Sequence, residues 1–145
     1  MRIGRGAFGE NTPSRALYLS PDHAVFVNGA LVPVKFLCNG TSIKQVKRRR
    51  VTYHHVELPG HAVILAEGLP VESYLDTGDR AHFAGQPTIR LFPDFATRRT
   101  DALALAWEAR GAAPLVVTGA RLAAARATVA ASPSGGLSRP ARSAA

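Results

Sequence analysis

The chain has 145 residues, of which 46% are hydrophobic and 19% are charged, so it can build a core and is not a disordered polypeptide. Its single cysteine, Cys38, excludes an internal disulfide and a multi-cysteine zinc site, and its net charge of +8 would favour an anionic partner. The first ten residues, MRIGRGAFGE, lack the apolar region of a signal peptide, and no run of about 18 apolar residues occurs. We therefore expect no membrane partner. The sequence does not indicate where in or outside the cell the protein is located.

Residues 15–69 divide into short runs of β-type residues separated by turn residues. In chain order the runs are ALYL, HAVFV, ALVPVKFL, TSIKQV, VTYHHVEL and HAVILA. Asn28-Gly29 and Asn39-Gly40 lie between such runs, and Asn-Gly accepts the positive φ angles of a type I′ hairpin turn. Pro33 has no N–H to donate to a ladder, so its strand is expected at a sheet edge or a bulge. The pattern predicts an antiparallel, hairpin-rich sheet.

A dense basic run, Lys47-Arg48-Arg49-Arg50, interrupts these elements. Closely spaced cations release counterions when they neutralise a nucleic-acid backbone. The favoured interpretation is a solvated turn between strands, because no aromatic side chains alternate with the run to stack on bases.

The composition changes to alanine and arginine beyond residue 97. Thr100 or Asp101 could cap a helix over DALALAWEAR that Gly111 ends, and a second helix is expected over residues 121–131. The remaining residues, SPSGGLSRPARSAA, are too polar and flexible to order themselves. We therefore expect a β domain over residues 1–97, a helical extension over residues 98–131 and a disordered tail over residues 132–145.

Two segments carry a resemblance to a known family. LYLSPDHAVFVNGALVPVKFLCNGTSI and VTYHHVELPGHAVILAEGLPVESYLDTG resemble the later part of a bacterial Hint domain, the fold shared by inteins and the self-processing portion of hedgehog proteins. Ser20-Pro21-Asp22-His23 is similar to the Thr-x-x-His motif of that family, and VELPGHAVILAEG is similar to its block near the C-terminal splice junction. The resemblance implies a mainly β, horseshoe-like antiparallel fold, here with one or two C-terminal α-helices.

The resemblance also implies a self-processing chemistry with three site residues. In that family a cysteine or serine attacks the preceding peptide carbonyl, and a histidine protonates the departing amide nitrogen. By this resemblance the histidine is His23, Ser20 is the hydroxyl residue that could fix the turn and aim the imidazole, and His61 assists C-terminal cleavage. No cofactor is implied, and the substrate is the protein's own polypeptide or a complementary N-terminal half.

The sequence departs from the family pattern at both reaction sites. Only nineteen residues precede Ser20 and none of them is a cysteine, and Glu72-Ser73 stands where inteins place His-Asn. Serine has no carboxamide that can cyclise, so full splicing is not expected. We expect an incomplete autoprocessing domain that is inactive alone for want of its nucleophile. The alternative is a small basic β-rich module that binds nucleic acid or an acidic protein. Nucleic acid is the less favoured partner overall.

The remaining candidate residues give weaker indications. A metal site would have to gather His23, His54 or His55, His61 and His82, and no short ligand spacing supports one, so none is expected. Adjacent His54 and His55 would face opposite sides of a strand. Cys38 is expected to be a small buried hydrophobic residue. The spacing of Glu57, Glu67 and Glu72 does not indicate an acid–base pair.

Overall fold

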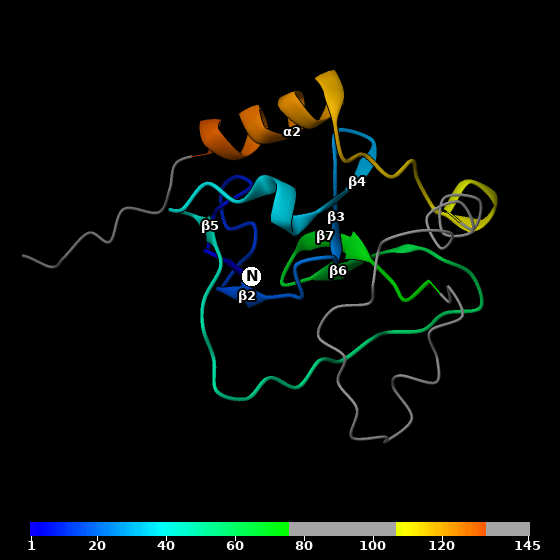
Figure 1. Ribbon diagram of the computed structural model, residues 1–145, viewed down its shortest axis with the longest axis horizontal. Helices are drawn as coiled ribbons and strands as arrows, with labels where there is room; N and C mark the ends of the chain where they lie inside the picture. Colours follow the sequence, from blue (N-terminus) through cyan, green and yellow to red (C-terminus); the bar gives the residue numbers. More distant parts are fainter. Residues whose placement is uncertain (76–106, 133–145) are drawn as a thin grey trace, which may run out of the picture.

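In the computed structural model, which describes residues 1–75 and 107–132, short strands form two antiparallel sheets (Figure 1). The first has the strand order β2-β1-β5 and comprises β1 (Arg2–Ile3), β2 (Leu17–Tyr18) and β5 (Ile43–Lys44). The second has the order β4-β3-β7-β6 and comprises β3 (Ala24–Val27), β4 (Ala30–Pro33), β6 (Val63–Ala66) and β7 (Leu69–Glu72). The mainly β, antiparallel fold class expected from the sequence is confirmed.

Two tight turns build the second sheet from hairpins. Asn28-Gly29 joins β3 to β4 with φ angles of 51° and 72°, and Glu67-Gly68 joins β6 to β7 with φ angles of 54° and 79°. Positive φ at both positions is the geometry of a type I′ turn, whose twist matches that of the flanking strands. Pro33 ends β4, which lies at the sheet edge as expected. The two hairpins meet where β3 pairs with β7.

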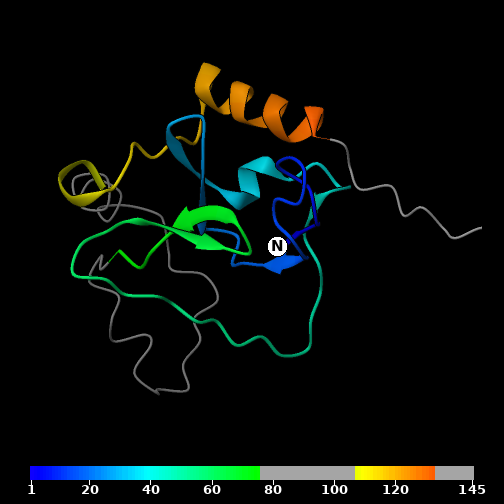
Figure 2. The same ribbon diagram turned by 180° about the vertical axis from the view of Figure 1, so that it is seen from behind.

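A C-terminal helix, α2 (Gly119–Ala131), packs on the β4 side of the molecule (Figures 1 and 2). Leu122, Ala125 and Val129 are spaced three and four residues apart, so they lie on one face of the helix. All three are buried in the same hydrophobic core as residues of the two sheets. Arg126 Nε donates a hydrogen bond of 2.8 Å to the carbonyl of Phe36 in the 3₁₀-helix η1 (Val34–Leu37). The helix expected over residues 121–131 is confirmed, and it shares a core with the β strands.

Removing the Leu122 side chain tests this packing. Leu122 is 6% exposed, and Leu122→Ala leaves a cavity that we expect to lower the unfolding free energy by about 2 kcal/mol, near the lower end for buried leucines. Arg121→Ala, an exposed neighbour on the same helix, should change it by less than about 0.5 kcal/mol. Urea unfolding followed by circular dichroism measures both, and equal effects would show that α2 does not contribute to the core.

The structure differs from the sequence-based expectations in three places. Asn39-Gly40 does not join paired strands: Asn39 Oδ1 accepts the N–H groups of Thr41 and Ile43, and β5 then pairs with β1. Residues 51–58 are exposed and form no strand, because no strand within residues 1–75 and 107–132 pairs with them. Cys38 is exposed rather than buried, since it follows η1 instead of ending a strand.

The described part of the helical extension also includes residues 107–110, which are helical and are followed by Gly111. Several expectations lie outside the described residues. They are the start of the helix expected over DALALAWEAR, the boundary at residue 97, the position of His82 and nearly all of the tail expected over residues 132–145. Within residues 1–75 and 107–132, no helix is long and apolar enough to cross a membrane.

Candidate active site

The turn Ser20-Pro21-Asp22-His23 leads directly into β3 and is held mainly by backbone hydrogen bonds. The N–H of His23 donates to the carbonyl of Ser20 at 3.3 Å, and the carbonyl of His23 accepts the N–H of Val34 at 3.0 Å. Lys35 reaches back to this turn through its ammonium group, which lies 2.6 Å from the Asp22 carboxylate. Among the described residues, the Ser20 hydroxyl has no hydrogen-bond partner, so Ser20 contributes to the turn through its carbonyl.

A carboxyl group from the neighbouring strand faces His23. Glu72 ends β7, and the antiparallel pairing of β7 with β3 brings it beside the start of β3. Glu72 Oε1 accepts the Ala24 N–H at 2.6 Å and lies 3.8 Å from Nδ1 of His23. The two side chains are 14% and 11% exposed for His23 and Glu72 respectively. The sheet register therefore creates a buried contact between residues 49 positions apart, counting from 23 to 72.

His61 faces the other oxygen of the same carboxyl group. Its Nε2 lies 3.8 Å from Glu72 Oε2, and its side chain is 0% exposed. Its Nδ1 accepts the N–H of Ala112 at 3.0 Å, so we assign the ring proton to Nε2. The Trp107 ring packs edge-on against the imidazole, with ring centroids 5.0 Å apart. His61 thus points a buried N–H at Glu72, and this N–H has no hydrogen-bond partner among the described residues. Burial lowers the pKa of His61, and the nearby Ser73 backbone opposes that shift.

Burial disfavours the charged forms of His23 and Glu72. Loss of solvent, and then the nearby His55, lowers the pKa of His23 to about 4. Loss of solvent raises the pKa of Glu72 to about 7, although the Ala24 N–H opposes that shift. Burial also lowers the pKa of His61. The separation of 3.8 Å would allow an ion pair, but burial disfavours both charges, so between about pH 4 and pH 7 the pair is neutral with its proton on the carboxyl group.

Two further groups surround this cluster. The His55 ring centroid lies 6.3 Å from that of His23, and its ring packs edge-on against Tyr74. Ser73 is buried and exchanges two hydrogen bonds with Ala62, at 2.8 Å and 2.9 Å, which fixes His61 relative to Glu72. Ser73 therefore holds the end of β7 against Ala62.

The structure brings together two of the three site residues expected from the sequence. His23 and His61 both face Glu72, whereas the Ser20 hydroxyl makes no contact with either imidazole. The sequence analysis missed Glu72, because its spacing from other carboxylates shows no acid–base pair. The signal that could have found it was the pairing of two hairpins, which sets the end of β7 beside the start of β3. In the described residues, no group of three or more His, Cys, Asp or Glu side chains could hold a metal ion.

Comparison with known proteins identifies the family. No curated protein and no solved structure matches the chain. A family model described as a Hint domain matches residues 1–78, which is more than half of the 145 residues and includes His23, His61 and Glu72. The chain therefore belongs to the Hint domain family.

Proposed function

We propose that this protein takes part in Hint-type self-processing, in which a peptide bond is cleaved through an N-to-S or N-to-O acyl shift. The observation that supports it most is the placement of His23: in the segment that matches the family, it is largely buried beside a carboxyl group that can share its proton. His23 is the proposed general acid of the reaction. The substrate is the protein's own polypeptide or a complementary N-terminal half.

The proposed reaction exchanges one bond for another at a peptide carbonyl carbon. A thiol or hydroxyl group attacks that carbon, a carbon–sulfur or carbon–oxygen bond forms, and the carbon–nitrogen bond breaks. The nitrogen leaves as an amine only if it gains a proton, which His23 supplies. The resulting thioester or ester is then cleaved by water or by another nucleophile.

The nucleophile in this proposal comes from outside the described residues. Ser14 is committed elsewhere, since its hydroxyl donates a hydrogen bond of 2.8 Å to Glu67 at the tip of the β6–β7 hairpin. Cys38 is exposed after η1 and has no contact with His23 in the described structure. We therefore propose that residues 1–75 and 107–132 supply the acid and that another segment supplies the attacking group, so that these residues are inactive alone.

Intact-mass analysis of the protein recovered from cells that express it from its own gene tests this function. Self-processing predicts a shortened product, whose formation is accelerated by hydroxylamine or an added thiol because both cleave esters or thioesters. A single unprocessed species, unchanged by either reagent, would contradict the proposal.

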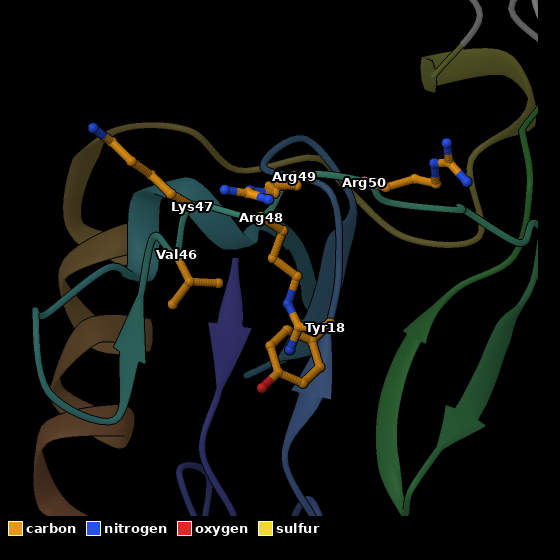
Figure 3. A pocket seen from close by; sticks show the side chains of 6 residues that line it. All are labelled: Tyr18, Val46, Lys47, Arg48, Arg49 and Arg50. Atoms are coloured by element: carbon orange, nitrogen blue, oxygen red, sulfur yellow. The ribbon is translucent and has the colours of Figure 1, made fainter.

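A basic surface supports a second candidate function, the binding of nucleic acid. Lys47, Arg48, Arg49 and Arg50 line a surface hollow of about 510 Å³ together with Tyr18 and Val46 (Figure 3). The Arg48 guanidinium lies 4.1 Å from the centroid of the Tyr18 ring, while Lys47 and Arg50 point away from it in different directions. No acidic group of the described residues forms an ion pair with these four side chains. Divergent cations suit an extended phosphate backbone better than a single phosphate.

Salt titrations with mixed-sequence DNA test the second function. If Arg49 and Arg50 each contact a phosphate, the double variant Arg49→Gln/Arg50→Gln should reduce the slope of log K against log salt by about 2. Arg121→Gln, an exposed arginine on α2, is the matched control and should leave the slope unchanged. Absence of binding by the unmodified protein at low salt would eliminate this function.

A further inference from the structure

His23 needs a second group to act as an acid at neutral pH. Burial holds its imidazole neutral, and a neutral imidazole is a poor acid unless its other nitrogen is protonated as the first proton leaves. The Glu72 carboxyl lies beside Nδ1, with its Oε1 3.8 Å away, and the Glu72 backbone also acts on this ring by opposing the lowering of the His23 pKa by burial. An approach of about 1 Å would bring these atoms to hydrogen-bond distance, as often occurs when a substrate tightens a catalytic contact.

We propose that Glu72 holds the proton that makes His23 an acid: the neutral carboxyl protonates Nδ1 of His23 while Nε2 of His23 gives its own proton to the leaving amide nitrogen. This inference rests on the self-processing function proposed above. Glu72 contacts His23 and not the bond that breaks, so it is a positioning residue. The sequence resemblance assigns no role to it.

Water carries the proton of the nucleophile back to Glu72 in this step. The carbon–nitrogen bond breaks, the nitrogen gains the Nε2 proton of His23, and Glu72 becomes a carboxylate. The nucleophile gives its own proton to water as its bond to the carbonyl carbon forms, and water returns a proton to Glu72. The acyl shift therefore consumes no proton, and no charge is left on the imidazole ring.

Two N–H groups are placed to stabilise the carboxylate that the step produces. The Ala24 N–H already donates to Oε1 at 2.6 Å. The Nε2–H of His61 is directed at Oε2 from 3.8 Å, and the Ala112 N–H fixes that tautomer through Nδ1. A buried N–H without a hydrogen-bond partner among the described residues lowers the stability of the resting protein. This N–H gains a partner when Glu72 becomes charged.

Other charged groups near the pair favour a protonated carboxyl at rest. The Asp22 carboxylate raises the pKa of Glu72, while His55 faces His23 and opposes a positive charge on that ring. Lys35 pairs with Asp22 and so reduces the influence of that carboxylate. His61 is held neutral by burial and favours the ionised carboxyl only through its N–H.

The variant Glu72→Gln separates a structural role from a proton-transfer role. The glutamine oxygen can take the position of Oε1 and accept the Ala24 N–H, so the amide keeps that hydrogen bond but has no proton to release to His23 Nδ1. We expect the rate of self-processing to fall at least tenfold. We also expect the ratio of wild-type to variant rates to decrease as pH rises through about 7, where wild-type Glu72 loses its proton.

Two controls decide between the outcomes. Glu67→Gln makes the same chemical change at the tip of the β6–β7 hairpin, where the partly exposed side chain pairs with Arg15, and should leave the rate and its pH dependence unchanged. Glu72→Asp, which keeps the acid but withdraws it by one methylene, should be slower than wild type with its pH dependence retained. A Glu72→Gln protein with the wild-type rate and pH profile would overturn the role of Glu72. A wild-type protein that is recovered unprocessed from cells that express it from its own gene would instead overturn the proposed function.

Discussion

Replacing His23 by asparagine reduces the rate of self-processing at least 100-fold in the proposed mechanism. General acid–base catalysis typically contributes about 10²- to 10⁴-fold, and asparagine keeps a polar group at the turn but cannot transfer a proton. The rate is measured from the appearance of the shortened product by intact-mass analysis at a fixed pH of 6.

The matched control for this variant is His54→Asn. His54 is exposed, on a segment that forms no strand, and it has no contact with the Glu72 carboxyl in the described structure. We expect less than a twofold change in rate for this control. Loss of cleavage in both variants would indicate a general effect of removing histidine, and undiminished cleavage in His23→Asn would refute its role as the acid.

Glu72→Gln is expected to change the pH dependence of stability. Wild-type Glu72 has a pKa of about 7 when folded and an ordinary value of 4.5. A raised pKa contributes stability that is fully present below pH 4.5 and is lost as pH rises through 7, because the folded protein binds the extra proton in that range. Glutamine has no such loss. The unfolding free energy of Glu72→Gln relative to wild type should therefore rise by about 3 kcal/mol between pH 4.5 and pH 7.5.

Urea unfolding of both proteins across this pH range measures the difference. The lowered pKa of His23 has the opposite effect, since its stability contribution is present above pH 6.5 and is lost as pH falls towards 4. In the comparison this contribution cancels to first order, because both proteins keep His23. A difference in unfolding free energy that does not vary with pH would show that the folded protein does not hold a proton on Glu72.

The sequence predicts the local β structure well because the signals are local. Asn28-Gly29 specifies a type I′ turn by its backbone preferences alone, and the apolar residues on either side form the paired strands β3 and β4. Pro33 restricts its strand to the sheet edge because it lacks an N–H. The change to an alanine- and arginine-rich composition beyond residue 97 likewise indicates α2.

The sequence does not predict which strands become neighbours, and the candidate site depends on that choice. Residues 51–58 have the composition of a strand, but a strand forms only where another strand offers a ladder of hydrogen bonds, and no strand of the described residues pairs with this segment. Likewise, Asn39 satisfies nearby N–H groups with its own side chain, so its turn does not produce a hairpin.

Glu72 shows the same limit at the level of chemistry. Next to Ser73 in the sequence it has no acidic or basic neighbour, and its pairing with His23 arises only because β7 lies beside β3. The resemblance supplied His23 and His61 by motif, but the sheet register places the Glu72 carboxyl group between them. The burial that changes the pKa values of this cluster is likewise a property of the packed fold.

The account depends most on where the proton lies between His23 and Glu72. Nuclear magnetic resonance can follow the carboxyl carbon of Glu72 and the imidazole carbons of His23 in one pH titration of the wild-type protein. We predict that Glu72 titrates near pH 7 and that His23 stays neutral down to about pH 4. A Glu72 that titrates near 4.5 beside a His23 that titrates near 6.5 would contradict the account.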